Sequence, residues 1–215
     1  MSIQAFKAVD LIEQFKSWKE LFSEQRDFLI ALDGQVGDSD LGITMSKAFA
    51  AASDALEAEG EAAGLAKLLR TAGATMARTA PSTMGTLTAT GFLRASKAVD
   101  GKNELDANDM ALFWRAFSDG IAERGKAKLG DKTIIDVLDP VAGSLEKSAV
   151  AGKELTAAMQ GAAETAGAAL EQTKTMVAQH GKAAAFQQKT VGLQDAGATV
   201  GHLLIRDMAA FIANR

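Results

Sequence analysis

Apolar residues recur at every third or fourth position along most of the chain, which is the spacing that places them on one face of a helix. In the stretch 9–32 they fall at Ile12, Phe15, Trp18, Phe22 and Leu29. This stripe predicts a helix that is stopped by Gly34. Similar stripes predict further helices over residues 41–58, 62–78, 84–98, 106–125, 133–149, 153–179 and 198–213.

Several of these stretches begin or end with residues that start or stop helices. Asp106 and Asp109 have the spacing of an N-cap and an acid in the first turn, and Gly125 is a natural C-terminal stop. The sequence has only two prolines and many alanines, which favours helix. We therefore predict one all-α domain over residues 1–215, an up-and-down bundle of about eight antiparallel amphipathic helices. In such a bundle alternate loops share one end, which brings together the loops at 33–42, 79–86, 125–133 and 181–197.

Composition places the chain among ordinary globular proteins and narrows its partners. Apolar residues make up 47% and charged residues 23% of the 215 positions, enough for one sizeable core. The net charge of -4 offers no broad positive field for nucleic acid or an anionic membrane. The absence of cysteine excludes disulfides and fits a reducing, cytoplasmic location. The sequence has neither the apolar core of a signal peptide near its start nor a run of about 18 uncharged apolar residues, so we expect no membrane span.

The first loop, within the sequence ALDGQVGDSDLGITM at 31–45, concentrates three aspartates: Asp33, Asp38 and Asp40. Mg²⁺ prefers oxygen ligands, and short carboxylates on a glycine-rich loop suit a rigid metal cage. The loop is not an EF-hand, because it lacks the third acid and the distal glutamate of that motif. The other interpretation is a capping turn, with Asp40 as the N-cap of the next helix and the other two acids solvated. Spacing alone leaves both interpretations open.

The second loop, TAPSTMGTLTA at 79–89, places Ser82, Thr83 and Met84 just before a helix and beside a glycine. Backbone N–H groups at such a helix start bind anions readily. The loop is not a Walker A motif, since no GKS or GKT follows. An ordinary N-cap after Pro81 explains the same residues.

The third loop, RGKAKLGDKTIID at 124–136, gathers basic residues at Arg124, Lys126, Lys128 and Lys132. Such a group serves a phosphate or the acids of a partner, but a solvated loop has the same composition.

The fourth loop lies within residues 180–202 and contains Lys182 and Asp195. Asp195 precedes a helix and is interpreted as an N-cap, a ligand of a nucleotide ribose, or both. The only histidines, His180 and His202, lack the spacing of metal ligands, and nothing supports a Ser–His–Asp triad.

Together, the four loops resemble the ADP-binding L subunit of dihydroxyacetone kinase, in order and over nearly the whole chain. LDGQVGDSDLGITM is similar to the family's D-x3-G-D-x-D-H-G-x-N-M motif. RGKAKLGDKTIIDV is similar to R-G-K-A-x-x-G-D-K-T-M-x-D-V, and LQDAGAT to H-Q-D-P-G-A-T. The second loop is the weakest of the four matches.

The resemblance implies a barrel of eight helices that binds ADP or ATP at one end through Mg²⁺. It implies that Asp33, Asp38 and Asp40 hold two Mg²⁺ ions, and it gives this chain no separate catalytic side chain. The residues that it places around the nucleotide are Leu41, Gly42, Ile43 and Thr44 at the phosphates, Thr83 and Met84 in the second loop, Gly125 and Ile134 beside the adenine, and Lys182, Asp195, Ala196 and Gly197 in a lid.

The resemblance further implies a phosphotransferase that is active only with a partner. In the family a separate K subunit holds dihydroxyacetone through a covalent link to histidine, and the phosphate comes from a phosphotransferase-system protein or from exchange with ATP. Two other functions remain open: a non-catalytic nucleotide–Mg²⁺ sensor that regulates a partner kinase or transcription factor, and a helical module that binds a divalent metal without nucleotide.

The sequence departs from the family pattern around the predicted phosphates. Leu41 and Thr44 replace the histidine and asparagine of the aspartate motif, and Leu193 replaces the histidine of the last motif. Met84 lies in a loop that replaces the family's G-A-S-G-P turn. Lys182 replaces an arginine and cannot form a bidentate fork. These changes leave the acceptor open between dihydroxyacetone and another small keto or hydroxy sugar.

Overall fold

The computed structural model describes residues 5–215 and confirms the predicted all-α class. The α-helices in this part of the chain are α1 (Ala8–Glu24), α2 (Arg26–Asp33), α3 (Leu41–Glu59), α4 (Leu65–Thr79), α5 (Thr83–Ala98), α6 (Ala107–Gly125), α7 (Ile135–Val150), α8 (Leu155–Gln172) and α9 (Ala196–Ala213). Short 3-10 helices occupy η1 (Glu61–Ala63), η2 (Thr173–Thr175) and η3 (Ala183–Thr190). Two short strands, β1 (Phe6–Lys7) and β2 (Glu104–Leu105), pair antiparallel.

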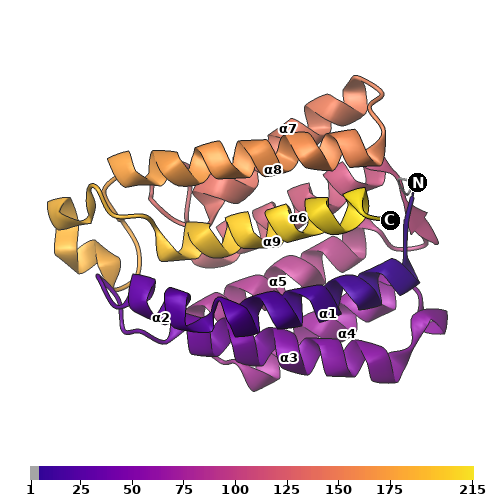
Figure 1. Cartoon of the computed structure of the whole chain (residues 1–215), viewed down its shortest axis with the longest axis horizontal. Helices are drawn as coiled ribbons and strands as arrows, with labels where there is room; N and C mark the ends of the chain where they lie inside the picture. Colours follow the sequence, from indigo (N-terminus) through magenta and orange to yellow (C-terminus); the bar gives the residue numbers. More distant parts are fainter. Residues whose placement is uncertain (1–4) are drawn as a thin grey trace.

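The long helices run side by side and form a closed bundle (Figure 1). From α3 to α9 each helix packs against the next, and α1 packs against both α3 and α9. The contact that closes the ring is partly polar: the carboxylate of Asp207 on α9 accepts hydrogen bonds from Gln14 (2.7 Å) and Ser17 (3.0 Å) on α1. Short connections and antiparallel neighbours therefore give the predicted up-and-down arrangement.

Aromatic side chains fill the centre of the bundle. Trp18 and Phe15 of α1 are fully buried, with ring centroids 5.1 Å apart in an edge-to-face arrangement. Phe92 of α5 lies 5.1 Å from Phe15 and 4.9 Å from Phe117 of α6. Because large aromatic rings bury much apolar area and interlock by their edges, this cluster fixes the positions of three helices.

The predicted first helix, 9–32, is two helices in the structure, so the described residues contain nine α-helices rather than about eight. The break lies at Gln25 (φ −83°, ψ 1°). After this break α2 packs against α3, where Gly42 lies close to the carbonyl oxygen of Arg26. A Cβ atom at Gly42 would lie 2.0 Å from that oxygen. The packing of α2 against α3 thus involves a tertiary contact that helical periodicity does not report.

The predicted helix 153–179 also ends early, at Gln172. The hydroxyl of Thr173 donates to the carbonyl oxygen of Leu170 (2.7 Å) and accepts a hydrogen bond from the amide of Asp195 (3.3 Å). These bonds divert the chain out of the helix and tie it to the start of α9. Val177, predicted on the helix seam, therefore lies outside α8.

The predicted signals around α6 are confirmed. The carboxylate of Asp106 accepts a hydrogen bond from the amide of Asp109 (2.9 Å), as an N-cap does. The helix ends at Gly125, but the left-handed residue that follows is Lys126 (φ 54°) rather than the glycine.

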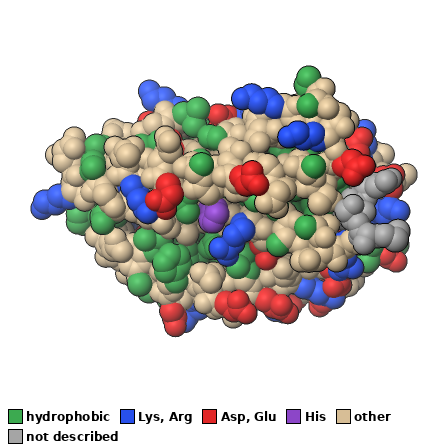
Figure 2. Space-filling model, turned by 45° about the horizontal axis from the view of Figure 1, so that its top comes forward, with side chains coloured by type: hydrophobic (Ala, Val, Ile, Leu, Met, Phe, Trp, Pro, Cys, Tyr) green, Lys and Arg blue, Asp and Glu red, His purple; other side chains and the backbone are tan. Residues whose placement is uncertain are grey.

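One helix, α9, has the length and mean hydropathy (1.2) of a candidate membrane span, although it carries Arg206 and Asp207. Of that segment, 56% is buried, and the helix lies between α1 and α8 (yellow in Figure 1). The same properties are typical of a core helix. On the face shown in Figure 2, basic and acidic side chains are interspersed rather than gathered in one large patch of a single sign.

Candidate functional site

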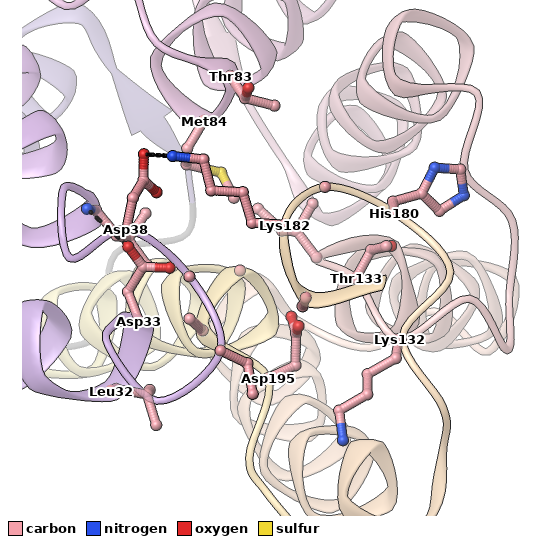
Figure 3. Close-up of a pocket in the computed structure, with 18 of the residues that line it drawn as sticks. Leu32, Asp33, Asp38, Thr83, Met84, Lys132, Thr133, His180, Lys182 and Asp195 are labelled. Carbon is pink, nitrogen blue, oxygen red and sulfur yellow. Dashed lines mark hydrogen bonds and ion pairs between the residues drawn. The ribbon is translucent and has the colours of Figure 1, made fainter. Parts of the chain in front are cut away.

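A cavity of about 370 Å³ opens at one end of the bundle, where the four predicted loops meet. Its walls come from the aspartate loop, the start of α5, the loop before α7 and the chain that precedes α9 (Figure 3). We call residues 173–195, which connect α8 to α9, the covering segment. The sequence prediction that these loops share one end is confirmed by this arrangement.

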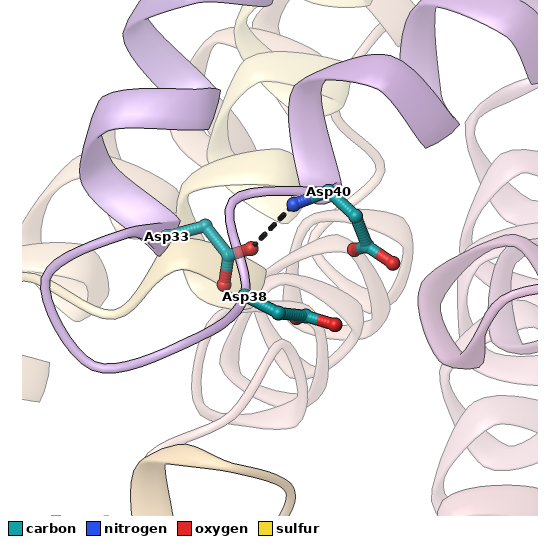
Figure 4. A group of neighbouring side chains, drawn as sticks. All are labelled: Asp33, Asp38 and Asp40. Carbon is teal, nitrogen blue, oxygen red and sulfur yellow. Dashed lines mark hydrogen bonds between the residues drawn. The ribbon is translucent and has the colours of Figure 1, made fainter.

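The three aspartates converge at the mouth of this cavity. One carboxylate oxygen from each of Asp33, Asp38 and Asp40 lies within 4.8 Å of the other two (Figure 4). Asp33 ends α2, while Asp40 immediately precedes α3. The loop between them closes tightly because Gly37 has no side chain: a Cβ atom there would lie 2.1 Å from Oδ1 of Asp33.

The capping interpretation of this loop is wrong for Asp40. Its side chain accepts no hydrogen bond from the first turn of α3. Instead, Oδ2 of Asp33 accepts from the amides of Asp40 (3.1 Å) and Leu41 (3.4 Å). Asp33 is thereby fixed against the start of α3, and the carboxylate of Asp40 points away from that bond (Figure 4).

The charges of this cluster favour a cation. Partial burial raises the pKa of Asp40, and the neighbouring charges of Asp38 and Asp33 raise it further. The hydrogen bond from Lys182 lowers the pKa of Asp38. Clustered carboxylates repel one another unless a cation neutralises them, and hard oxygen ligands suit Mg²⁺. The donor set therefore fits a divalent metal.

Lys182 joins the covering segment to the aspartates. Its ammonium forms an ion pair with Oδ2 of Asp38 (Figure 3). The predicted basic residue of the lid thus lies beside the predicted metal ligands, although 144 residues separate the two in sequence.

The start of α5 is a capped helix N-terminus, as the N-cap interpretation of the second loop predicts. The hydroxyl of Ser82 accepts a hydrogen bond from the amide of Gly85 (3.2 Å). Thr83 and Met84, the first residues of the helix, line the cavity. Capping and cavity lining therefore coincide in this loop.

The third loop is folded around two carboxylates. Asp136 accepts from the amides of Gly130 (2.6 Å) and Thr133 (2.7 Å). Asp131 accepts from the amide of Lys128 (2.9 Å) and lies 2.8 Å from Nε2 of His180. Four basic residues were predicted as a patch. Within the part of the chain that the structure describes, Lys132 alone among them lines the cavity.

Asp195 is the N-cap of α9, as predicted. Its Oδ1 accepts from the amide of Ala198 (2.6 Å), and Asp195, Ala196 and Gly197 all line the cavity. Burial raises the pKa of Asp195 to about 6, although the hydrogen bond from Ala198 and the charge of Lys132 oppose this shift.

Asp195→Asn is expected to stabilise the protein at neutral pH. The folded-state pKa lies above the ordinary value of 3.8, so the folded chain binds this proton more tightly, and stability is lost as the pH rises from about 4 to about 6. Asparagine keeps the capping oxygen and removes the ionisation. We expect the free energy of unfolding near pH 7 to rise by roughly 1–3 kcal/mol. Urea unfolding at several pH values measures this, and an unchanged pH profile would contradict it.

Most of the residues predicted to contact a nucleotide line the cavity. They are Leu41, Thr83, Met84, Ile134, Lys182, Asp195, Ala196 and Gly197, together with the three aspartates. Ile43 and Thr44 line a smaller recess of about 230 Å³ that shares Asp40 with the cavity.

Two predicted contact residues, Gly42 and Gly125, belong to neither lining. Gly42 faces the backbone of α2, and Gly125 lies behind Leu87, whose side chain is part of the wall. Both glycines are therefore placed for close contact between helices rather than at the cavity surface.

Several lining residues are outside the set that the resemblance places around the metal and the nucleotide. They are Leu32, Val36, Gly37, Leu87, Lys132, Thr133, His180, Gly181, Ala183, Thr190, Leu193 and Gln194. Of the apolar ones, Leu87 lies one helical turn from the predicted Met84 on α5, so helical spacing was a usable signal there. The sequence assigned His180 no role as a metal ligand or in a Ser–His–Asp triad, and its contact with Asp131 had no sequence signal.

A carboxylate cluster at the mouth of a partly apolar cavity, on an all-helical bundle, suits a metal-dependent ligand site. The family model described as the DAK2 domain matches residues 35–210. The ADP-binding subunit DhaL of a PEP-dependent dihydroxyacetone kinase from Escherichia coli is 32% identical over 180 residues, which cover 84% of this chain and 85% of that protein. The corresponding subunit of kinase 1 from Listeria innocua is 34% identical, over 88% and 89%. The chain belongs to the DAK2-domain family.

The fold is shared with a larger solved protein. The dihydroxyacetone kinase from C. freundii, in complex with AMP-PNP and Mg²⁺, matches 93% of this chain with a TM-score of 0.72 and 23% identity. This chain covers 33% of that one. The resemblance inferred from the four loops is therefore confirmed at the level of the family and the fold.

Proposed function

We propose that this chain is the nucleotide-binding subunit of a dihydroxyacetone-type kinase. It carries ADP or ATP with Mg²⁺ and transfers phosphate to a small ketose that a separate K-type subunit holds. The observation that carries the proposal is the convergence of Asp33, Asp38 and Asp40 at the mouth of the cavity. The names of the relatives as ADP-binding subunits of PEP-dependent kinases support it, and we propose a cytoplasmic location for the chain.

The residues around the cavity suit the parts of a nucleotide. The aspartates would hold Mg²⁺, two ions by the family pattern, and bound Mg²⁺ would neutralise the phosphate oxygens. The start of α3 lies beside them, and the amides at a helix N-terminus favour anions. Met84, Leu87 and Ile134 form an apolar wall that suits a flat base. Lys182 brings a positive charge to the aspartates, which would be the phosphate end of the site.

Phosphoryl transfer relies on positioning and on charge neutralisation rather than on covalent chemistry by the protein. The site therefore needs no nucleophile of its own, provided that the partner presents the hydroxyl of the acceptor. The phosphate would return to bound ADP from a phosphotransferase-system protein, as the PEP-dependent names of the relatives suggest, or ATP would exchange for ADP. The acceptor is dihydroxyacetone or a related small ketose.

The purified protein is expected to bind ADP in the presence of Mg²⁺ and far more weakly in its absence. Calorimetric titration with ADP, in Mg²⁺ and then in EDTA, measures this difference. A titration with GDP under the same conditions, compared with ADP, reports whether the apolar wall prefers an adenine base. An affinity that does not depend on Mg²⁺ would argue against the aspartate site, and no ADP binding at all would refute the proposal.

A phosphate-carrying kinase subunit and a nucleotide sensor differ in whether they phosphorylate an acceptor sugar repeatedly. With a K-type subunit, dihydroxyacetone and either ATP or a phosphotransferase-system phosphate donor, the carrier is expected to form the sugar phosphate continuously. A sensor would bind the same nucleotides but would leave the acceptor unphosphorylated with every partner tested.

A further inference from the structure

Lys132 is a buried lysine whose charge is enclosed by backbone. Its side chain is 4% exposed, and its backbone adopts the left-handed conformation (φ 60°) that a non-glycine residue rarely occupies. The ammonium donates to the carbonyl oxygens of Met176 (3.2 Å), Thr190 and Leu193 (2.8 Å). All three protons of the ammonium thus have carbonyl acceptors, and all three acceptors belong to the covering segment.

This arrangement differs from that of a phosphate-binding lysine. The ammonium of Lys132 is turned away from the aspartates, whereas that of Lys182 reaches them (Figure 3). Burial lowers the pKa of Lys132, while the charge of Asp195 opposes this effect. Lys132 therefore organises the backbone around it, much as a bound cation would.

The covering segment has few other anchors of comparable strength. Its exposed apolar side chains, Phe186 (42%) and Val191 (45%), point to solvent, and Gln187 has a positive φ of 49°. The amide of Gln179 donates to the carbonyl oxygen of Asp131 (3.0 Å), and His180 contacts the carboxylate of the same residue. Both of these anchors, like Lys132, lie in the loop before α7, whereas the ion pair of Lys182 with Asp38 ties the segment to the aspartate loop. Because the segment buries little apolar surface, polar anchors decide its order.

We infer that Lys132 is a positioning residue that holds the covering segment over the cavity and thereby sets the rate at which bound nucleotide leaves. This role rests on the proposed function, since it presumes that the cavity takes a nucleotide. Lys132 joins carbonyls 44 to 61 residues away along the chain, so its loss would free both ends of the segment at once. Release would then accelerate without a change in the metal ligands.

The variant Lys132→Met keeps the length of the side chain and adds no new backbone strain, since methionine and lysine are both unbranched at Cβ. The control Lys128→Met removes the same charge from an exposed position of the same loop. The release of a fluorescent ADP analogue with Mg²⁺, chased by excess ADP, is expected to be about tenfold faster or more in Lys132→Met. The control is expected to stay within about twofold of wild type, and association rates to change little in either variant.

Hydrogen exchange without nucleotide tests the same role independently of binding. The amides of Ala178 and Gly192, bonded to the Thr190 hydroxyl and the Lys174 carbonyl, are expected to lose protection in Lys132→Met, while amides of α5 and α6 keep theirs. Equal loss across the bundle would assign Lys132 to global stability and overturn the inference. If Lys132→Met fails to fold, Lys132→Gln takes its place, with the same local loss expected.

The two proposals fail in different ways. A wild type that binds no nucleotide refutes the proposed function and, with it, the effect on release. A wild type that binds ADP, beside a Lys132→Met that releases it at the wild-type rate, overturns only the role of Lys132.

Discussion

Replacing Asp38 and Asp40 together by asparagine is expected to abolish Mg²⁺-dependent nucleotide binding while the helical bundle stays folded. Both carboxylates lie with Asp33 in the cluster whose oxygens are within 4.8 Å. Each lost charge removes a ligand worth about 1.5–3 kcal/mol, so two cost roughly 3–6 kcal/mol, or about a hundredfold or more in affinity. The fold is expected to persist because the amides at the start of α3 are bonded to Asp33, which the variant retains.

The measurement is a titration with ADP and Mg²⁺, with circular dichroism to confirm the helical content. The matched control is Asp27→Asn with Asp100→Asn, which removes two carboxylates whose side chains are 89% and 72% exposed and which lie outside the cavity. The control is expected to bind as wild type does. Retained affinity in the double variant of the cluster would show that the nucleotide is held elsewhere.

The helices and the shared end of the loops were predictable because each rests on a local signal. The period of apolar residues defines a helix from its own sequence, as along α6, and short loops impose antiparallel neighbours. Asp106 and Asp195 were found as N-caps because the cap bonds amides only three residues away. All three aspartates lie within eight residues of one loop, but this spacing left a capping turn open, and the metal interpretation rested on the family resemblance.

Features that depend on distant partners had no such signal. The role of Lys132 is defined by carbonyls that lie 44 to 61 residues away, so a basic loop was all that its sequence showed. Asp33 rather than Asp40 accepts hydrogen bonds from the amides at the start of α3, because α2 packs against α3 there. Both features depend on contacts between segments that are distant in the sequence. The local pattern of residues around each position does not show such contacts.

The contact between α2 and α3 at Gly42 can be tested by mutation. Gly42→Ala is expected to destabilise the protein. A Cβ atom at Gly42 would lie 2.0 Å from the carbonyl oxygen of Arg26 and 2.9 Å from the side chain of Ile30. The first atom belongs to the backbone, so no rotamer change relieves the clash and α2 must move. We expect the free energy of unfolding to fall by roughly 1–3 kcal/mol, even though alanine favours helix.

Gly143→Ala on α7 is the matched control, since its nearest neighbour would be Nη2 of Arg115 at 3.9 Å, an ordinary contact. There the helical gain of alanine is unopposed, and stability is expected to rise by about 0.5–1 kcal/mol. Urea unfolding of both variants measures the free energy of unfolding. Both gain the same helix propensity of alanine, so a difference between them reports the contact between α2 and α3. Because α2 carries Asp33, Gly42→Ala is also expected to weaken ADP binding. A Gly42→Ala protein as stable as Gly143→Ala would mean that α2 does not meet α3 at this glycine, and the aspartate loop would then need another support.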